Sequence, residues 1–424
     1  MKKILIISSF IPYPYNAGGH IGVFEMINHF REKYDLSLVV PCINKEDISS
    51  YKELKALWPD VNIYIFQKTF LQRITNSFFY KLQKIFYLAF KKRYFRDSIW
   101  HHDKSGIVEN IFNYTEHISD RLFANYVNDI IQSDQFDLVQ VEFYGNISLP
   151  VFLKQTCPVA FIHHELRFVK SEREVATIAP DDKFLKGMLA QLKSYEIEML
   201  KNYNRIVLMS EIDKNILSPY LPENLLYVSP SGIKIRGKNT GTENYVFNNI
   251  LTFLGGENHY PNIDGLVWFM ENCFSLLLQQ HPSIKLHIIG KWGHEFISKY
   301  ESEKIRFLGF VENLDEALLN SIMIVPVRIG SGIRMKIIDG INAGIPFVTT
   351  TIGVEGWDFR NNMDCFIADT PEEYVRCLSQ LITDKQMQNL FIRNSQIRLK
   401  ELYSFDKAME KRQKLYDSIF LKNS

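Results

Sequence analysis

A chain of 424 residues exceeds what one ordinary hydrophobic core accommodates, which favours two domains of about 150–220 residues each. Hydrophobic residues make up 46% of the sequence, a composition that is typical of a globular protein and excludes a disordered chain. The formal net charge is only +1, so bulk nucleic-acid binding is not indicated. The five cysteines are scattered and form no C-x-x-C pair, which favours reduced thiols over a disulfide framework or a zinc site.

The beginning of the sequence does not resemble a secretory signal. The apolar run from Ile4 to Phe10 is only as long as a strand, and it leads into Pro12 and Pro14 instead of a small-residue cleavage site. The sequence holds no uninterrupted apolar stretch of about 20 residues, the length that crosses a bilayer. We therefore expect a cytoplasmic protein, either in solution or peripheral at the inner face of the plasma membrane.

The first half of the sequence alternates short apolar runs with helical patterns. A loop with Gly18 and Gly19 follows the first run, and apolar residues then recur at helical spacing from Val23 to Phe30. Continuous apolar runs of this length are typical of strands that are buried on both faces of a parallel sheet. We expect such strands at residues 3–8, 36–40, 137–143, 158–162 and 205–209. The order of strands and helices predicts a parallel α/β sheet.

The second half repeats this organisation after a change in composition. Residues 234–249 are polar and lack periodicity, which predicts an interdomain linker. Further strands are expected at residues 250–254, 285–289, 305–308, 323–326 and 346–350. We expect one domain at 1–235 and a second at 246–404, with a C-terminal helix at 405–424 that crosses back onto the first. Two such domains would face each other across a cleft, where the carboxyl ends of parallel strands bind ligands.

The strongest candidate site follows the strand predicted at 323–326. Gly330 and Gly332 let the backbone approach a ligand closely and turn its N–H groups towards it. The N-terminus of the helix that follows attracts anions at the same place. The segment therefore predicts an anion-binding turn.

Basic side chains strengthen this prediction. Arg334 and Lys336 add two formal cations, and Arg328 is a candidate for a third. Charge-assisted bonds from Arg and Lys stabilise a diphosphate more than a helix dipole does, since the dipole contributes only about 0.3–1 kcal/mol. Asp339 lies one turn further along, at a reach suited to a ribose hydroxyl. The alternative is a tight turn whose basic residues are merely solvated.

Three segments resemble the donor half of the family-4 glycosyltransferases of the GT-B fold, the glycosyl transferases group 1. They are residues 326–356, the F-L-G-G…Y-P-N motif within 253–262, and F-L-G-F-V at 307–311. The likeness extends over nearly the whole C-terminal half and more weakly over the N-terminal half. It implies an α/β chain of the GT-B fold, with two Rossmann-like parallel-sheet domains that face each other across a cleft.

The resemblance also implies roles for individual residues. In the family, the glycine-rich turn binds the nucleotide diphosphate and an acidic residue of the next helix holds the ribose. The family's helix usually reads E-A-M-A-x-G, whereas this chain has Asp339 in the sequence D-G-I-N-A-G, so the shorter side chain needs a closer ribose or a bridging water. The donor-binding residues implied in this way are Gly18, Gly19, Gly256, Arg328, Gly330, Ser331, Gly332, Ile333, Arg334, Lys336, Asp339 and Glu355.

Two adjacent histidines, His163 and His164, end the strand predicted at 158–162. The family often places a histidine there that contacts the donor sugar or the reacting centre. Spacing does not distinguish the two, and we favour His164; a packed or solvent-facing histidine is the alternative. Because the chemistry depends on stabilising the departing diphosphate, Lys336 and Arg334 complete the catalytic candidates.

Three other motifs are poorly supported. Residues 232–238 fit G-x-x-x-x-G-K, but Asn239 stands where a P-loop has Ser or Thr. Gly18, Gly19 and Gly22 do not form the G-x-G-x-x-G pattern of a nicotinamide site. No D-x-D triplet occurs, which argues against a metal-dependent single-Rossmann glycosyltransferase. The resemblance implies that no metal or other cofactor is required.

Residues 73–96 hold seven basic and no acidic side chains. Apolar residues recur among them at helical spacing, as in helices that lie in a membrane interface. Each basic residue near an anionic leaflet contributes about 1 kcal/mol, so this segment is a candidate membrane face. The alternative is a helix that packs its apolar side on the N-terminal domain.

The resemblance as a whole implies a retaining, metal-independent hexosyltransferase. Its donor would be a UDP- or GDP-sugar and its acceptor a hydroxyl group, on a glycan or lipid-linked glycan of a bacterial envelope polysaccharide. Two alternatives stay open: a GT-B sugar-nucleotide epimerase or phosphorylase, and a non-catalytic nucleotide-binding partner subunit.

Overall fold

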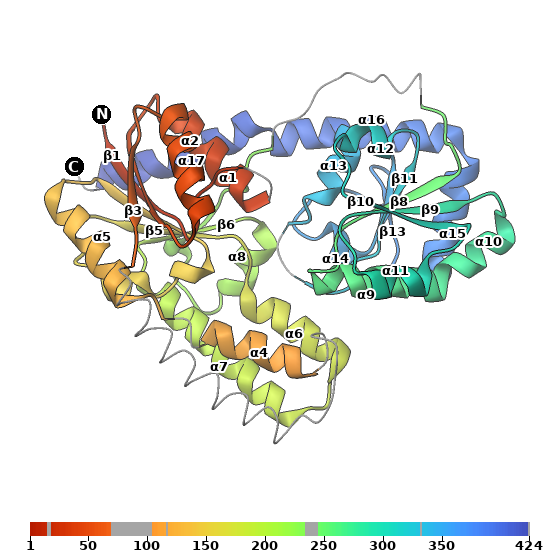
Figure 1. Ribbon diagram of the computed structural model, residues 1–424, viewed down its shortest axis with the longest axis horizontal. Coiled ribbons are helices and arrows are strands. Elements are labelled where there is room, and N and C mark those ends of the chain that lie inside the picture. The colour runs from red at the N-terminus through yellow and green to blue at the C-terminus, as the bar shows by residue number, and fades with distance from the viewer. Residues whose placement is uncertain (15–17, 69–103, 116–117, 234–244, 331–332, 423–424) are drawn as a thin grey trace. The chain divides into compact units, whose positions relative to one another are not determined.

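The chain divides into two compact units, each with its own parallel sheet (Figure 1). The computed structural model describes residues 1–14, 18–68, 104–115, 118–233, 245–330 and 333–422. Met1–Ser229 and Met409–Ser424 form the N-terminal unit, and Pro230–Ala408 form the C-terminal unit. The first boundary falls a few residues before the expected one because Ile233 is tied to the C-terminal unit. Its backbone N–H donates to Tyr403, and its carbonyl accepts from Phe405.

The N-terminal unit is built on a seven-stranded sheet in the order β3-β2-β1-β4-β5-β6-β7, with every neighbouring pair parallel. The strands are β1 (Lys3–Ile7), β2 (Asp35–Pro41), β3 (Asn62–Phe66), β4 (Leu138–Glu142), β5 (Val159–His163), β6 (Arg205–Leu208) and β7 (Leu226–Val228). The five predicted strands are present within one residue at either end. The two edge strands, β3 and β7, were not predicted, because one is only half-buried and the other has three residues.

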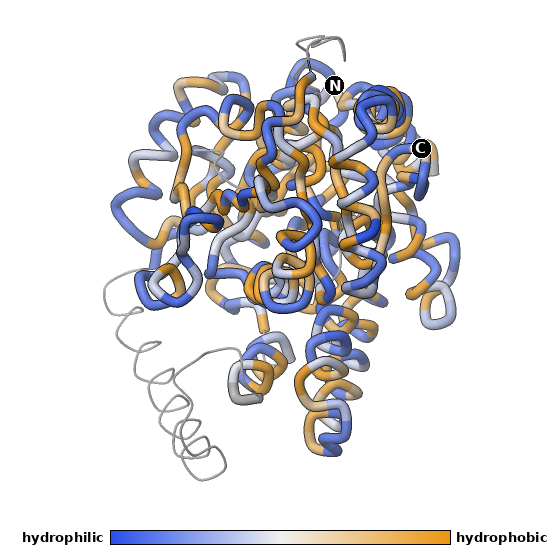
Figure 2. Tube along the Cα trace, turned by 90° about the vertical axis from the view of Figure 1, so that its right-hand side faces the viewer, coloured by the Kyte–Doolittle hydropathy of each residue, from blue (hydrophilic) through white to orange (hydrophobic). Residues whose placement is uncertain are grey.

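Helices pack on this sheet (Figure 1). Hydrophobic and hydrophilic residues alternate along the helical turns of the chain (Figure 2). The helices are α1 (Gly18–Phe30), α2 (Lys45–Leu57), α4 (Lys104–Thr115), α5 (Arg121–Ser133), α6 (Arg167–Ile178), α7 (Lys183–Leu200), α8 (Glu211–Leu217) and the C-terminal α17 (Phe405–Lys422). Ser210 caps α8 by accepting a hydrogen bond from the Asp213 N–H, as serine commonly does at a helix start. Short 3₁₀ turns, η1 (Tyr144–Asn146), η2 (Leu149–Val151) and η3 (Glu223–Leu225), complete the unit.

The C-terminal unit is built on a six-stranded parallel sheet in the order β10-β9-β8-β11-β12-β13. Its strands are β8 (Ile250–Leu254), β9 (Lys285–Ile289), β10 (Ile305–Gly309), β11 (Ile322–Val325), β12 (Phe347–Thr349) and β13 (Phe366–Ile367). All five predicted strands are found, and only the two-residue β13 was not expected. Parallel α/β architecture is thus confirmed for both units.

Two hydrophobic clusters pack on the sheet of the C-terminal unit. One cluster involves α9 (Tyr260–Phe269), the π-helical turn η5 (Met270–Phe274), α10 (Ser275–Gln280), α11 (His294–Tyr300) and α15 (Pro371–Thr383). The other involves α12 (Leu314–Leu318), α13 (Lys336–Asn342), α14 (Thr351–Val354) and α16 (Lys385–Tyr403). These layers bury the strands, so the polar groups available to a ligand lie at the strand ends.

The strand order places one switch point in each sheet. Connections leave in opposite directions from the adjacent strands β1 and β4, and likewise from β8 and β11. Ligands of open α/β sheets bind beyond the carboxyl ends of such strand pairs. The segments after these four strands are therefore where candidate site residues are sought.

In the part of the chain that the structure describes, no helix has the length and apolar character needed to span a membrane. The candidate membrane face at 73–96 lies outside the described residues.

Candidate functional site

Lys336 lies at the switch point of the C-terminal unit, as the first residue of α13. Its Nζ donates a 2.7 Å hydrogen bond to Oδ1 of Asn262 and lies 4.9 Å from the ring centroid of Phe253. Phe253 belongs to β8 and Asn262 to α9, so three elements position this one ammonium group. Asn262 in turn donates through Nδ2 to the carbonyl of Gly256, 3.0 Å away.

The surroundings of Lys336 disfavour the positive charge of its ammonium group. Burial, and to a smaller extent the nearby charge of Arg334, lower the pKa of Lys336 to about 7. Both effects penalise the charged form, and an anion bound beside Lys336 would oppose them. The surroundings of Lys336 are therefore suited to a negatively charged ligand.

Glycines allow the loops around Lys336 to pack closely. Gly330 has a φ of 119°, and a Cβ there would lie 2.9 Å from Nη2 of Arg334. Gly255 has a φ of 157°, and its Cβ would lie 2.7 Å from the amide of Asn262. Both positions need glycine for conformation, and Gly255 needs it for space as well. Ser331 and Gly332, between Gly330 and the helix, lie outside the described residues.

Arg328 is held by an ion pair within the C-terminal unit. Its Nε and Nη2 donate to the two carboxylate oxygens of Asp264, at 3.1 and 2.6 Å, and its guanidinium lies 5.5 Å from the ring centroid of Trp268. The side chain of Asp264 is only 7% exposed, and the pair fixes the loop after β11 onto α9. This favours an anchoring role for Arg328 over the expected role as a third cation for a diphosphate.

The other predicted residues of this unit lie around the same loops. Arg334 lies just before α13, and its carbonyl accepts a 3.2 Å hydrogen bond from the Trp357 indole. Asp339 is half-buried in the first turn of α13, and Glu355 is half-buried directly after α14. Ile333 packs its side chain against the hydrophobic cluster, which leaves its backbone as the part suited to a ligand.

In the N-terminal unit, the two predicted histidines have different environments. His163 Nε2 lies 2.8 Å from Oε1 of Glu196, and both side chains are fully buried. Glu196 also accepts the backbone N–H groups of Arg167 and Phe168, so this pair fixes the start of α6. The burial of His163 argues against its predicted role as a catalytic residue.

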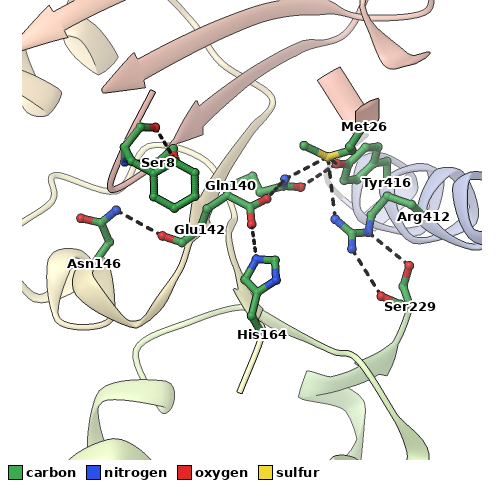
Figure 3. A network of polar contacts seen from close by, with 10 residues as sticks. Ser8, Met26, Gln140, Glu142, Asn146, His164, Ser229, Arg412 and Tyr416 are labelled. Atoms are coloured by element: carbon green, nitrogen blue, oxygen red, sulfur yellow. Dashed lines mark hydrogen bonds and ion pairs between the residues drawn. The ribbon is translucent and has the colours of Figure 1, made fainter. Parts of the chain in front are cut away.

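His164 is the accessible member of the pair, with 22% of its side chain exposed. Its Nε2 lies 2.8 Å from Oε2 of Glu142, the buried last residue of β4 (Figure 3). Phe143 stacks on the imidazole with a centroid separation of 4.1 Å and an interplanar angle of 11°. His164 is thus the more accessible of the two predicted histidines.

The predicted glycine loop begins α1, of which Gly18 is the first residue. A Cβ on Gly19 would lie 3.1 Å from the ring of Phe143. Gly19 therefore leaves room for the aromatic ring that covers His164, a role that the glycine pattern did not indicate.

Three polar residues around these sites were not assigned from sequence: Glu142, Asn262 and Asp264. Glu142 ends a predicted strand, and Asn262 belongs to the Y-P-N motif that resembles the glycosyltransferase family. Their positions in the sequence are therefore the only features that could have identified them. Among the described residues, no group of three or more His, Cys, Asp or Glu side chains is arranged to hold a metal ion.

A cavity of about 480 Å³ opens in the N-terminal unit near the carboxyl ends of β1, β2 and β3. Its wall is mostly apolar, and it includes Lys68 and Asp120, which form an ion pair. The lining residues include Pro41, Ile43, Phe66, Ile118, Phe123 and Asn146.

Comparison with known proteins agrees with this architecture. The profile of the family described as glycosyl transferases group 1 matches residues 248–384. An uncharacterized 44.6 kDa protein from the cps region of Klebsiella pneumoniae is 21% identical over 385 residues, which cover 87% of this chain and 88% of that protein.

Solved structures resemble the whole chain at low identity. A point mutant of S. aureus TarM in complex with Fondaparinux, alpha-GlcNAc-glycerol and UDP has a TM-score of 0.67 at 12% identity, with 98% of this chain and 100% of TarM covered. Alr3699/HepE of Anabaena, in complex with UDP, has a TM-score of 0.63 at 11% identity, covering 99% and 100%. Sucrose-phosphate synthase of Thermosynechococcus elongatus has a TM-score of 0.68 at 12% identity and full coverage of both chains. The chain therefore has the GT-B fold and carries a glycosyl transferases group 1 domain at residues 248–384, which confirms the family resemblance.

Proposed function

We propose that this protein is a retaining glycosyltransferase that moves a sugar from a UDP- or GDP-sugar to a hydroxyl acceptor. The observation that carries the proposal is the position of Lys336 beyond the β8/β11 switch point, beside Arg334 and bonded to a neutral amide. Such a group is suited to a diphosphate. UDP in the structures of TarM and HepE, and UDP-glucose in another HepE structure, support a uridine nucleotide and a hexose donor.

In this proposal, Lys336 and Arg334 stabilise the charge that develops on the departing diphosphate. Charge-assisted hydrogen bonds at that position act on the transition state more than on the bound donor, which accelerates the reaction. Backbone groups of the turn at 330–333 complete the phosphate contacts. Asp339 binds the ribose, and Glu355 and Gly256 lie along the same donor site. Retention of configuration and independence from metal follow from the family resemblance.

His164 contacts the transferred sugar in this proposal. Its half-buried ring, held by Glu142 and Phe143, is suited to hydrogen bonding with a sugar hydroxyl. His163 has no contact with substrate and serves the packing of α6.

The acceptor is proposed to bind the N-terminal unit. The cavity near β1–β3 has a size typical of ligand pockets, and its apolar wall with one ion pair suits an acceptor that carries an apolar group. The relative from a cps region supports a role in polysaccharide synthesis. A glycan or lipid-linked glycan of the bacterial envelope, reached from the cytoplasmic side of the membrane, fits both observations.

Product analysis with the purified full chain tests the proposal. UDP- and GDP-sugars are incubated with and without oligosaccharide and lipid-linked acceptors, in the presence and absence of EDTA. We expect a glycosylated acceptor with the donor's anomeric configuration, equal rates in EDTA, and only slow hydrolysis without acceptor. Conversion of the donor sugar without acceptor would identify an epimerase instead. Nucleotide binding without turnover on any acceptor would identify a non-catalytic subunit.

The proposed membrane contact of residues 73–96 has a separate test. Liposome flotation should show binding to vesicles with anionic lipid and none to neutral vesicles. Failure to float with anionic vesicles would remove this part of the proposal.

A further inference from the structure

Both carboxylate oxygens of the buried Glu142 are engaged by side chains. Oε1 accepts a 2.6 Å hydrogen bond from Gln140 Nε2, and Oε2 lies 2.8 Å from His164 Nε2 (Figure 3). A buried carboxylate is costly without donors, and an ionised carboxylate only accepts. The imidazole of His164 therefore carries its proton on Nε2.

Gln140 connects Glu142 to the C-terminal helix. Because an ionised carboxylate only accepts, the amide nitrogen of Gln140 faces Glu142. Its Oε1 then accepts a 2.5 Å hydrogen bond from the hydroxyl of Tyr416, on α17. A tyrosine of the C-terminal helix thus helps to fix the carboxylate that holds His164.

Phe143 contacts the same imidazole from its face, and its backbone is strained. Its φ is 67° and its ψ is 150°, a region that residues with a side chain rarely adopt, at a cost of about 1–3 kcal/mol. The neighbours of Phe143 stabilise this conformation: its ring stacks on His164 and packs against Phe10 with a centroid distance of 4.5 Å. Strain of this kind persists where the surrounding structure requires it, often at functional sites.

Gly19 completes the arrangement by the absence of a side chain. A Cβ there would lie 3.1 Å from the ring of Phe143, so any larger residue requires the ring to shift by a few tenths of an ångström. Two consecutive residues thus contact the imidazole of His164. Glu142 bonds to its edge, and Phe143 stacks on its face.

We infer that Glu142 and Phe143 are positioning residues that hold His164 in one orientation and one tautomer, with Nε2–H bound to Glu142 and Nδ1 as the nitrogen for a sugar hydroxyl. This inference rests on the proposed function, in which His164 contacts the sugar. It assigns Glu142 a role that acts only through His164. Loss of Glu142 should consequently matter only while His164 is present.

A double-mutant cycle with Glu142→Gln and His164→Ala tests this dependence. Glu142→Gln keeps the size of the side chain, and we expect it to lower kcat by about 10- to 100-fold, as loss of a supporting group typically does. Adding it to His164→Ala should lower kcat by no more than about twofold further, since coupled residues are non-additive. Affinity for UDP should stay unchanged in all three variants. Fully additive losses would overturn the inference.

The tautomer is measured independently by NMR of full chain labelled with ¹⁵N in its histidine rings. The His164 signals are identified by their loss in His164→Ala. In wild type, we expect a protonated Nε2 and an unprotonated Nδ1. The Nδ1–H tautomer in wild type would overturn the inference even if Glu142→Gln and Phe143→Leu fail to fold, because the assignment needs only His164→Ala.

One further variant tests the role of Phe143, and the two single variants of the cycle distinguish failure of the proposed role of His164 from failure of the positioning role of Glu142. Phe143→Leu keeps an apolar side chain without the stacked ring, and we expect it to lower kcat by about three- to tenfold, in proportion to the loss of one aromatic contact. If His164→Ala itself leaves transfer unchanged, the proposed role of His164 fails. If His164→Ala lowers transfer but Glu142→Gln does not, only the positioning role of Glu142 fails.

Discussion

The two sheets share a topology around their switch points but carry different chemistry beyond them. In the C-terminal unit, the ammonium of Lys336 is bonded to a neutral amide, and burial lowers its pKa to about 7. In the N-terminal unit, the imidazole of His164 is bonded to a buried carboxylate. A cation with a neutral partner suits an anionic ligand, whereas an imidazole with a carboxylate partner suits a neutral hydroxyl. The hydrogen-bond partners of Lys336 and His164 thus indicate that Lys336 is suited to the diphosphate of a nucleotide-sugar and His164 to a sugar hydroxyl.

The same distinction exists within the C-terminal unit. Arg328 is paired with Asp264 through two hydrogen bonds, while Lys336 has only the amide of Asn262 as its described hydrogen-bond partner. Arg328 and Lys336 lie in the same short sequence motif, and the sequence does not show which of the two is paired with a carboxylate. Their partners come from α9, about 70 residues earlier in the chain.

The largest effect is expected for Lys336→Ala. Removing one group that stabilises transition-state charge typically lowers kcat by about 10²–10³-fold, and we expect a loss of that size in sugar transfer. Lys285→Ala is the matched control, because Lys285 is exposed at the amino end of β9. Transfer rates are measured by nucleotide release. Equal rates for Lys336→Ala and wild type would contradict the assignment of the diphosphate to the C-terminal unit.

The adjacent histidines should respond to substitution in opposite ways. His164→Ala should transfer sugar about 10- to 100-fold more slowly, as loss of a residue that supports the chemistry does. Its loss of stability should be smaller than that of His163→Ala, because the His164 side chain is 22% exposed. His163→Ala removes one of three donors to the buried carboxylate of Glu196, which destabilises a protein by about 1–3 kcal/mol. Thermal unfolding and kcat per folded molecule separate the two effects. A His163→Ala protein that is stable but inactive would reverse our assignment.

The last expected effect is a dependence of UDP affinity on pH, which is small close to pH 7 and grows towards pH 9. Lys336 binds a diphosphate when protonated, and its pKa is about 7 without ligand, so affinity should fall as the pH rises from 7 to 9. The decrease is at most about tenfold per pH unit, and binding should take up protons in this range. Calorimetry in two buffers of different ionisation enthalpy measures that uptake. Lys336→Ala should show neither effect, and a wild-type affinity that is constant above pH 7 would contradict the assignment.

The lowered pKa also has a consequence for stability without ligand. In the unfolded chain, Lys336 has its ordinary pKa of 10.5, so unfolding takes up a proton between about pH 7 and that value. The free energy of unfolding therefore contains a contribution that increases with pH across this window.

Much of the fold followed from local sequence patterns. Buried parallel strands are continuous apolar runs, and the ten predicted strands match the structure within one residue. The missed strands, β3, β7 and β13, are half-buried or have only two or three residues, so they lack that pattern. The unit boundary was less predictable, because the contact of Ile233 with Tyr403 and Phe405 joins segments that are far apart in the chain.

The candidate site was predictable where it is contiguous in sequence and not where it depends on tertiary contacts. Lys336 and Arg334 belong to one short motif. The choice between His163 and His164 was not predictable, because consecutive strand residues face opposite sides of a sheet and only packing decides which side is covered. The covering group for His163 is Glu196 on α7, and no local pattern links these two residues.

The central claim is that the surroundings of Lys336 hold a nucleoside diphosphate, and titration calorimetry of UDP and GDP into the full chain tests it most directly. We predict that wild type and Lys285→Ala bind one of these nucleotides with equal affinity, and that Lys336→Ala binds it at least about tenfold more weakly, which corresponds to the loss of one charge-assisted hydrogen bond. Absence of binding to wild type, or equal affinity in Lys336→Ala, would contradict the claim.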